Sequence, residues 1–428
     1  MVVEVNKILL VLPSKSYRNQ AFFDAARSLG VAVTVVTDQP YPYGFGDNVL
    51  VADLDRHALE GATERLLAQI DSSQYDAVVG VDDSSTLLAA SLAQRLGLPS
   101  SSPEALAASS NKELMRKRLG IVEASQPRWL TVDPTDPDQS VNEIAAKFGT
   151  GPVVIKPLSL SQSRGVIRAN NEAELYDALS LTASVNRHYG HEGEPLLVEE
   201  YIEGREVVLE GMLNAQKLVT LAIFDKPEPL TGPYFEETIY LTPTNLPDAQ
   251  SKELHRILEH SCRSLGLSLG PIHAEFRLTE DGRPYLIELA ARTIGGLCSK
   301  TLRFSTGETL EHLVILNALG AETHHSEQGR SAAGVVMLPT PASGIFQGLR
   351  NLDEIKSIPF VEEVDITAPI GSEVFAPPLS EQYLGFVFVR APGRQAALQS
   401  LRAVLRVASV EIETAPTHRS ENVAHGEQ

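Results

Sequence analysis

The sequence predicts a fold that is α/β in its N-terminal part and α+β in its C-terminal part. Three observations support this prediction: apolar strands alternate with helices in the first hundred residues, an acidic hairpin follows near residue 280, and strands surround one helix beyond residue 330. At 428 residues the chain is too long to fold around a single ordinary hydrophobic core, so we expect about three domains. In this prediction, the first domain spans residues 1–108 and the last spans 331–428. The middle domain has two halves, 109–200 and 201–330.

The composition argues against several classes of protein. A formal charge of -19 repels the phosphates of nucleic acid and of anionic lipid, so we expect neither as a partner. No apolar run approaches ~20 residues, the length that crosses a bilayer, and the first residues continue into a strand pattern. We therefore expect neither a membrane span nor a signal peptide. The two cysteines, Cys262 and Cys298, match no metal-binding spacing and favour a reducing cytoplasm.

The first hundred residues repeat a strand and a helix. The runs KILLVLP (7–13), VAVTVVT (31–37) and DAVVGV (76–81) are apolar and β-branched, as in strands buried within a parallel sheet. A helix ending at Leu29-Gly30 separates the first two runs, and the helix STLLAASLAQRLG follows the third. This pattern predicts a doubly wound α/β layer. The residues after the first strand, PSKSYRNQ, lack the G-x-G-x-x-G of dinucleotide-binding proteins, which argues against a nicotinamide-dependent oxidoreductase.

Two lysines in the next segment occupy unusual places. Asn111 is a suitable cap for a helix that ends at Gly120, which puts Lys112 in the first turn. There the helix dipole disfavours a cation unless a phosphate lies nearby, although an exposed surface lysine is the ordinary alternative. After a Pro- and Asp-rich loop at 133–140, the strand GPVVIKP carries Lys156 at its end, inside an apolar run. Burying this ammonium group is costly unless an anion pairs with it.

A serine-rich loop, SLSQSRGV, follows Lys156. Its hydroxyl and amide groups are suited to hold phosphate oxygens, although most such loops are simple turns. Further along, PLLVEEYIEGREVVLEGML predicts two strands around a tight turn at Glu203-Gly204. Alternation puts Glu199 and Glu200 on opposite sides, so some of these acids point inward, where a carboxylate needs a donor such as a ribose diol or an exocyclic amine. The alternative is a charged edge strand.

The segment HAEFRLTEDGRPYLIELAAR predicts a hairpin with two acids face to face. If Asp281-Gly282 is a two-residue turn, Glu275 lies directly opposite Glu288. Like charges in this position are destabilising and need a cation, a shared proton or open solvent. Mg²⁺, which takes one or two carboxylates together with substrate phosphates, suits the spacing best. The alternative is a solvated edge with two unrelated acids.

Alternation also predicts which side chains share the face of this acid pair. Three lie on each strand, with Arg292 just beyond: His273, Glu275 and Arg277 on the first, and Leu286, Glu288 and Ala290 on the second. His273 could then touch a substrate, although a packed structural histidine is the more common case. A planar guanidinium at position 292 can hold two oxygens of one anion, whereas the structural alternative is an ion pair with an acid such as Glu275.

Two further segments complete the pattern. Residues 222–246 contain four prolines, so we expect a long, stiffened, irregular stretch on the substrate side, with a plain surface excursion as the alternative. Beyond residue 330, the runs AAGVVMLPTP, FVEEVDI, LGFVFVRAPGRQAALQSLRAVL and VASVEI predict strand, strand and strand-helix-strand, an α+β cap. The polar residues at the end of the chain are expected to be disordered.

In this order, the motifs between residues 105 and 300 resemble the ATP-grasp superfamily of carboxylate-amine ligases. The resemblance implies an ATP-grasp fold that binds ATP with Mg²⁺ or Mn²⁺. It implies a nucleotide site in which Lys112 and Lys156 bind the phosphates, under a closing loop that contains Ser161, Ser163 and Gly165. In the implied site, Glu199 binds the adenine amine, Tyr201 and Ile202 form the adenine hinge, and Glu206 binds the ribose hydroxyls. The resemblance also implies two metal ligands, Glu275 and Glu288, and two catalytic residues, Arg292 and Lys156. Five further residues are candidates for the substrate side: His273, Lys226, Glu236, Gly295 and Gly296.

Two departures from the superfamily pattern narrow the resemblance. Many members read E-x-N-x-R at the last acid, whereas this chain reads ELAAR at 288–292, and Ala290 offers no ligand atom for a second metal. The phosphate loop is serine-rich where others are glycine-rich. The E-x-A-A-R form and the segment FDKPEPLTGPYFEETIYLTP look most like the L-amino-acid ligases and carnosine-synthase-type enzymes.

The narrower resemblance implies an ADP-forming ligase that joins a small carboxylate, an L-amino acid, to an amine through an acyl phosphate. Small molecules are then its partners, and a homodimer is the assembly to test. Two alternatives stay open. One is a related ATP-grasp enzyme of carboxylation or purine biosynthesis, and the other is a nucleotide-binding protein without turnover, for which Ala290 gives slight support.

Overall fold

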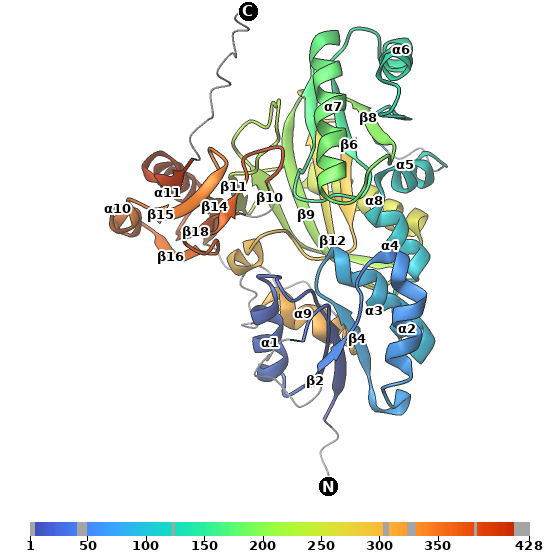
Figure 1. Cartoon of the computed structure of the whole chain (residues 1–428). Helices are drawn as coiled ribbons and strands as arrows, with labels where there is room; N and C mark the ends of the chain where they lie inside the picture. The colour runs from blue at the N-terminus through green and yellow to red at the C-terminus, as the bar shows by residue number, and fades with distance from the viewer. Residues whose placement is uncertain are drawn as a thin grey trace, which may run out of the picture.

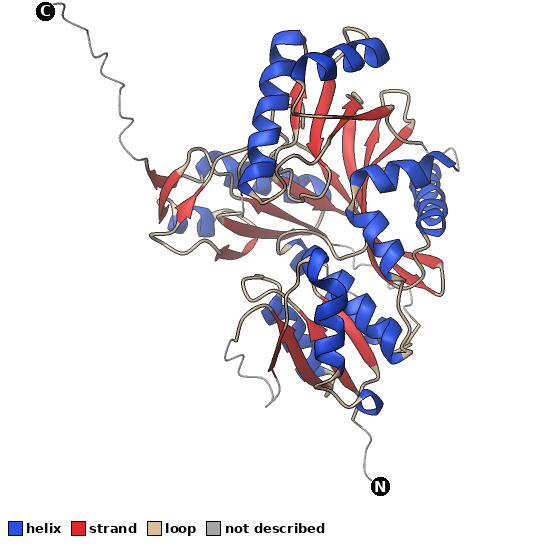
Figure 2. Ribbon diagram, turned by 45° about the vertical axis from the view of Figure 1, so that its right-hand side comes forward, coloured by secondary structure: helices blue, strands red, loops and turns tan. Residues whose placement is uncertain are grey.

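Four β-sheets form the framework of the computed structural model (Figure 1). The structure describes residues 5–40, 49–121, 125–302, 308–322, 331–380 and 383–414, and the polar C-terminal tail predicted to be disordered lies outside them. Figure 2 shows an N-terminal lobe, with helices on both sides of its strands, beneath a larger part built on antiparallel sheets.

The N-terminal sheet is parallel, with strand order β3-β2-β1-β4. Its elements are β1 (Lys7–Val11), α1 (Asn19–Ser28), β2 (Ala32–Thr37), β3 (Val49–Val51), α2 (Leu59–Leu67), β4 (Ala77–Gly80) and α3 (Asp83–Leu96). Residues Ile8 and Leu10 of β1 pack with α1 and with α9 (Leu310–Ala318), whereas Leu9 and Val11 pack with α2 and α3. The predicted doubly wound layer is therefore confirmed, although one of its covering helices comes from far along the chain.

Two helices connect this lobe to the rest of the molecule: α4 (Pro103–Ser110) and α5 (Lys112–Ile121). The Asn111 side chain accepts a hydrogen bond from the Leu114 N–H at 3.0 Å, which confirms the predicted helix start. The helix ends one residue later than predicted. Both helices pack with α8 (Asp248–Leu265) in one apolar cluster against the central sheet.

A small antiparallel sheet, of order β5-β8-β6-β7, follows. Its strands are β5 (Trp129–Val132), β6 (Val153–Pro157), β7 (Ile167–Ala169) and β8 (Leu196–Glu200), with α6 (Pro137–Phe148) and α7 (Glu172–His188) packed against them. Strand β6 is buried throughout and ends beside Lys156, as predicted. The loop predicted at 133–140 is wrong in its second half, because Asp136 caps α6 and Pro137 fits its first position.

The central sheet has eight antiparallel strands in the order β13-β12-β9-β10-β11-β14-β18-β16. They are β9 (Arg205–Asn214), β10 (Lys217–Lys226), β11 (Ile239–Thr242), β12 (Gly270–Leu278), β13 (Pro284–Ala290), β14 (Ala332–Met337), β16 (Val361–Ile366) and β18 (Gly385–Ala391). The predicted irregular stretch at 222–246 is therefore too long, because it includes the last residues of β10 and the whole of β11. Residues 227–238 and 243–246 lie outside the two strands.

Strands β8 and β9 do not form the predicted hairpin. They belong to different sheets, and residues 201–204 carry the chain from one sheet to the other. Gly204 makes this crossing, with φ at +147° and with its Cα against the Leu278 carbonyl of β12. Strand pairing over the whole molecule decides between a hairpin and a crossing, and a Glu-Gly pair is compatible with both.

The C-terminal residues extend the central sheet. Strands β14, β18 and β16 belong to it, while β15 (Gly344–Leu349), β17 (Glu373–Val374) and β19 (Val410–Glu413) form a separate sheet, with α10 (Leu352–Ser357) and α11 (Arg394–Val407). The predicted strands β14, β16 and β18, helix α11 and strand β19 are present in that order, but β15, α10 and β17 were not predicted. The sheet crosses the boundary proposed at residue 330, so our division into domains stays a prediction.

The β12–β13 hairpin pairs Glu275 with Glu288, as predicted, but without the two-residue turn that was expected. Its loop has three residues, 280–282, with Gly282 at φ +81°. A bulge then adds Ile287 to the second strand and restores the register. Because the bulge shifts the alternation, Leu286 pairs with Phe276 and enters the core, and does not share the face of Glu288 as predicted.

Candidate active site

A cleft of about 980 Å³ lies between the small sheet and the central sheet. Side chains from α5, β6, β8, β9, β12 and β13 and from the segments between them line it. Many of the residues singled out from the sequence meet there: Lys112, Lys156, Ser163, Glu199, Tyr201, Ile202, Glu206, His273, Glu275, Glu288, Arg292 and Gly295. The sequence motifs that lie as much as 180 residues apart therefore converge on one site.

Glu199 binds two cations at the base of the small sheet. Its Oε1 accepts from Arg116 Nε at 2.6 Å and its Oε2 from Lys156 Nζ at 2.6 Å, and all three side chains are buried. Burial alone would raise the pKa of Glu199, but the two cations outweigh it and lower the pKa to about 2. Both oxygens are engaged by charged donors, and the role at the adenine amine stays a prediction.

Lys112 faces both the serine-rich loop and the hairpin. Its ammonium group donates to the Leu160 carbonyl at 2.7 Å and lies 3.8 Å from Glu288 Oε2. Burial alone would raise the pKa of Glu288, but Lys112 and then Arg292 lower it. Glu288 is therefore an ionised carboxylate on the wall of the cleft.

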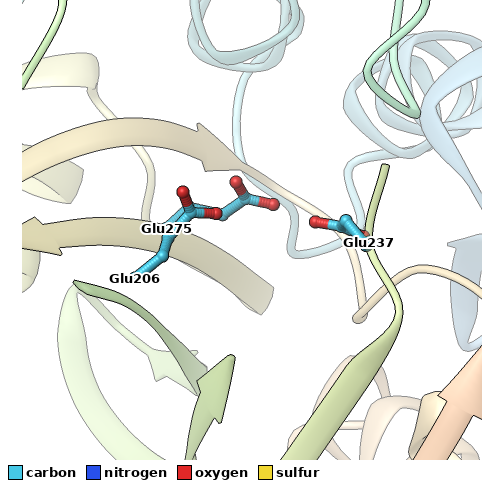
Figure 3. Close-up of side chains that lie close together, drawn as sticks. All are labelled: Glu206, Glu237 and Glu275. Carbon is cyan, nitrogen blue, oxygen red and sulfur yellow. The ribbon is translucent and has the colours of Figure 1, made fainter. Parts of the chain in front are cut away.

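Three carboxylates, of Glu206, Glu237 and Glu275, bring oxygens within 4.8 Å of one another (Figure 3). Lys226 Nζ lies among them, at 2.5 Å from Glu206, 2.5 Å from Glu237 and 3.4 Å from Glu275. Burial alone would lower the pKa of Lys226, but the three carboxylates raise it well above its usual value. The ammonium group already occupies the centre of this cluster, so we do not assign a metal to it.

Arg277 links this cluster to the chain crossing. It lies opposite Glu206 in the β9–β12 register, and its Nε is 3.1 Å from Glu206 Oε2. Burial alone would raise the pKa of Glu206, but Lys226 and Arg277 lower it to about 2. The guanidinium also donates to the Ile202 carbonyl at 2.9 Å. Glu206 and Ile202, singled out for the ribose and the adenine, are thus held by one arginine.

The two predicted metal ligands reach the cleft with separate cationic neighbours. Glu275 has His273 Nε2 at 3.3 Å and Lys226 at 3.4 Å, whereas Glu288 has Lys112. Both offer hard oxygen donors on neighbouring positions of one sheet, which is the chemistry that Mg²⁺ favours. Ala290, opposite His273, adds no donor atom. The residues present fit one metal ion, and their role as its ligands stays a prediction.

His273 is 3% exposed and carries two acidic neighbours. Its Nδ1 is hydrogen-bonded to Glu210, which lies opposite it on β9, and its Nε2 faces Glu275. Burial alone would lower the pKa of His273, but Glu210 and Glu275 raise it to about 9. The side chain is thus a protonated, packed histidine that also lines the cleft.

Arg292 is held by the N-terminal lobe. Its Nε donates to Asp83 Oδ2 at 2.8 Å, where Asp83 is the first residue of α3. Burial alone would lower the pKa of Arg292, but Asp83 and then Glu288 raise it. Arg18 of the same lobe donates to the carbonyls of Thr293 and Ile294 at 3.4 and 2.9 Å. The structural partner of Arg292 is therefore Asp83 and not Glu275.

The serine-rich loop runs from Leu158 to Val166 and contacts two other parts of the molecule. Ser159 accepts a hydrogen bond from Arg56 of the N-terminal lobe at 2.9 Å, and the Gly165 N–H donates to the Pro378 carbonyl at 3.0 Å. Ser163 lines the cleft with φ at +54°, whereas Ser161 hydrogen-bonds to Arg164. Ser161 and Gly165 do not line the cleft in this arrangement.

Of the remaining residues predicted on the substrate side, Gly295 lines the cleft and Glu236 lines a second cavity. The Gly296 N–H donates to the Tyr17 hydroxyl at 2.8 Å. The Tyr201 ring stacks on Phe235 at 6.5 Å between centroids. Glu236 faces away from the cleft, because its carboxylate accepts from the Thr340 N–H at 2.9 Å and lines a second cavity.

Four charged residues near the site were not among the predicted site residues. Glu210 and Glu237 lie in acidic segments that the sequence singles out, since one shares the alternation of Glu206 and the other adjoins Glu236. Arg116 and Asp83 had no such signal. Their partners lie 83 and 209 residues away along the chain, and nothing local distinguishes them from exposed helix residues.

Three family models match the chain in the order of its parts. They are an ATP-grasp N-terminal domain over residues 23–100, an ATP-grasp domain over 150–301 and an L-amino acid ligase C-terminal domain 2 over 336–414. Together with the structural neighbours below, these matches show an ATP-grasp fold for this chain. The central match contains Lys156 and Arg292 and all the acids discussed above except Asp83.

Individual proteins agree with this assignment. The chain is 26% identical to dapdiamide A synthase of Enterobacter agglomerans, over 80% of its own length and 82% of that protein. It is 26% identical to carnosine synthase 1 of Homo sapiens, over 68% of its length and 37% of that protein. The crystal structure of L-amino acid ligase from Bacillus licheniformis superimposes with a TM-score of 0.81 at 22% identity, covering 96% of this chain and 100% of that one.

These comparisons confirm the predicted ATP-grasp fold and the likeness to carboxylate-amine ligases of the L-amino-acid ligase kind. Among the helices in the described ranges, none combines the length and the apolar character that crossing a bilayer requires.

Proposed function

We propose that the protein is an ADP-forming ligase that joins the carboxyl group of an L-amino acid to an amine. The observation that carries this proposal is the convergence of Lys112, Lys156 and Arg292 with the Glu275–Glu288 pair in one cleft. Three cations suit the phosphates of a nucleotide and a substrate carboxylate, and two hard acids suit a divalent metal. The match of residues 150–301 to an ATP-grasp domain supports ATP as the nucleotide.

The proposed reaction has two steps. An oxygen of the substrate carboxylate attacks the γ-phosphorus of ATP, the bond to the bridging oxygen breaks, and ADP leaves an acyl phosphate behind. The nitrogen of an amine then attacks the acyl carbon, phosphate leaves, and the nitrogen gives up a proton. Such transfers depend on positioning and charge neutralisation more than on covalent help from the protein.

Each charged residue has a task in this scheme. Lys112 and Lys156 hold phosphate oxygens, and Arg292, with Asp83 behind it, holds two oxygens of the carboxylate and of the acyl phosphate. Glu275 and Glu288 would hold Mg²⁺ or Mn²⁺, which when bound neutralises charge on the transferred phosphoryl group. We assign the adenine to the wall formed by Glu199, Tyr201 and Ile202, and the ribose to Glu206.

The serine-rich loop is the proposed cover of the phosphates. Ser161, Ser163 and Gly165 offer hydroxyl and amide donors, and the loop already contacts both the N-terminal lobe and the segment near Pro378. Closing the loop keeps water from the acyl phosphate, which would otherwise hydrolyse.

We place the reaction in a reducing cytoplasm, since both cysteines are buried and free. Small molecules are the proposed partners, and a formal charge of -19 disfavours nucleic acid. A homodimer stays a prediction that light scattering at several protein concentrations will decide.

The test is to incubate the purified protein with ATP, Mg²⁺ and pooled L-amino acids, and to measure nucleotide, phosphate and product mass. We expect ADP, phosphate and a dipeptide or related amide in equal amounts. Glu288→Gln should lose turnover while calorimetry still detects nucleotide binding, whereas Glu280→Gln, at the exposed hairpin loop, should behave as the wild type. AMP and pyrophosphate as products, or ATP cleavage that needs bicarbonate instead of an amino acid, would contradict the proposal.

A further inference from the structure

A second cavity of about 510 Å³ adjoins the cleft. Five residues line both spaces: Gln162, Ser163, Phe235, Glu237 and Tyr383. The other walls of the second cavity come from the serine-rich loop, the 227–238 stretch and the C-terminal part, including Leu338, Pro377 and Pro378. The five shared residues place the two spaces side by side.

Glu236 lines this second cavity, and within the described ranges no cation forms an ion pair with its carboxylate. Its carboxylate accepts one hydrogen bond, from the Thr340 N–H at 2.9 Å. Burial raises the pKa of Glu236, and this hydrogen bond only partly offsets it. The neighbouring Glu237, in contrast, is paired with Lys226 at 2.5 Å and accepts from the Tyr383 hydroxyl at 3.0 Å.

Arg164 also lines the second cavity, and its guanidinium has other partners. The Arg164 guanidinium donates to the Ser161 carbonyl at 2.9 Å and lies 4.6 Å from the centre of the Tyr189 ring. A carboxylate that is more than half removed from water favours a positively charged partner. The free position beside Glu236 is therefore one that a cation from outside the chain can fill.

The rest of the wall suits an organic cation better than a metal ion. Tyr234, Phe235 and Tyr383 contribute aromatic rings, whose faces attract ammonium and guanidinium groups. Leu338 and Pro378 offer apolar surface for an aliphatic chain. A single carboxylate among rings and apolar groups provides too few oxygen ligands for Mg²⁺ or Ca²⁺.

We infer that one of the two substrates is an amino acid with a positively charged side chain, whose charged end binds Glu236. This inference rests on the proposed ligase function and names the substrate class for it. The α-carboxyl or α-amino group reacts in the cleft, the aliphatic part of the side chain passes the shared wall, and an ammonium, guanidinium or imidazolium group meets Glu236 between the aromatic rings.

The experiment compares L-lysine, L-ornithine, L-arginine and L-histidine with L-norleucine, which has the length of lysine without its charge. We expect kcat/KM at least about tenfold higher for the best cationic amino acid than for norleucine, the size of one charge-assisted hydrogen bond. The product mass shows whether that amino acid enters as the acyl or the amine partner. Equal kcat/KM for lysine, arginine, histidine and norleucine would overturn the inference.

Glu236→Gln keeps the shape and removes the charge. It should raise KM for the cationic amino acid at least about tenfold and leave KM for norleucine within about twofold. Glu236→Lys should reverse the preference toward L-glutamate. The matched control is Glu228→Gln in the same stretch, whose carboxylate pairs with Arg402 at the surface and should have no such effect. An unchanged KM in Glu236→Gln, in protein with the wild-type melting temperature, would overturn the inference.

The two proposals can fail separately. ATP cleavage that proceeds equally well with neutral amino acids keeps the ligase and rejects the cation site. If no amino acid supports ATP cleavage, the ligase proposal fails. Calorimetric measurement of L-lysine binding then tests the cation site at Glu236 independently of turnover. Binding that Glu236→Gln abolishes would support the cation site, and an absence of lysine binding would reject it.

Discussion

At the scale of single residues, the charged groups of the cleft act in pairs and triads. Arg292 is buried at the end of β13, and its position depends on Asp83, a carboxylate of the N-terminal lobe. The ion pair at Nε and the hydrogen bond from Nη1 to the Thr293 carbonyl at 3.0 Å together fix the plane of the guanidinium. A lysine at this position would bring one point charge without the planar fork.

Arg292→Lys tests this geometry. We expect kcat to fall at least ~10²-fold, an order-of-magnitude figure for removing a positioned donor, while the net charge and fold are kept. ATP cleavage and the melting temperature are the two measurements. A variant whose melting temperature falls while its activity per folded molecule stays at the wild-type level would show that Arg292 only supports the hairpin. Arg283→Lys, at the exposed end of the same hairpin, is the matched control.

At the scale of elements, the crossing between β8 and β9 decides how the two sheets meet over the cleft. Tyr201 and Ile202 lie in this crossing, and Gly204 ends it with φ at +147°. A Cβ atom at position 204 would lie against the Leu278 carbonyl of β12, closer than van der Waals contact allows. The glycine is therefore required by both the backbone conformation and the close approach of the strands.

Gly204→Ala should lower the free energy of unfolding by about 2–4 kcal/mol, since it adds backbone strain and a steric clash. Urea denaturation followed by circular dichroism measures the change. Gly190→Ala separates the two causes, because Gly190 also has a positive φ, +81°, but open space around its Cα. That control should cost only about 1–2 kcal/mol. Equal effects of the two substitutions would mean that the close approach to Leu278 is unimportant.

At the scale of the whole molecule, buried ion pairs tie together parts that are distant in sequence. Arg116 of α5 binds Glu199 of the small sheet and also donates to the Leu286 and Ile287 carbonyls of β13 at 2.9 and 2.6 Å. Arg18 similarly joins the N-terminal lobe to the segment after β13. Such contacts hold the N-terminal lobe, the small sheet and the central sheet against one another. Removing one member leaves a buried charge without its partner, which is strongly destabilising.

Glu199 gives this network a pH dependence with a defined sign. Its pKa is about 2 in the folded protein and 4.5 as the ordinary value, so the folded state favours the ionised form. The stabilisation is complete above pH 4.5 and is lost as the pH falls through the folded pKa. Glu199→Gln should lower the free energy of unfolding by roughly 3–5 kcal/mol at pH 7, and the gap to the wild type should narrow below pH 4.5.

Urea denaturation of both proteins at pH 7, 5 and 3.5 checks this prediction. Glu200→Gln is the control, because Glu200 lies next to Glu199 but pairs with the exposed Arg128. An effect within about 1 kcal/mol is expected there at pH 7. A gap for Glu199→Gln that stays constant from pH 7 to 3.5 would contradict the assigned charge state.

The sequence by itself determined the class of the fold and much of the chemistry of the site. Apolar runs predict β1, β2, β4 and β6 because burial selects apolar residues directly, and capping predicts the start of α5 in the same way. The opposition of Glu275 and Glu288 was also predicted, although a three-residue loop and a bulge produce it together. Local patterns carry this information because they depend on neighbours within a few residues.

The tertiary structure alone decided the pairing of sheets and the partners of the charges. The β8–β9 crossing, the extension of the central sheet by β14, β18 and β16, and the position of α9 on the N-terminal lobe depend on contacts between distant segments. The same holds for Asp83 behind Arg292 and for Lys226 among three acids. A sequence shows that a buried charge needs a partner, but the partner is whichever opposite charge the folded chain brings within reach, because ion pairing depends on distance in space and not along the chain.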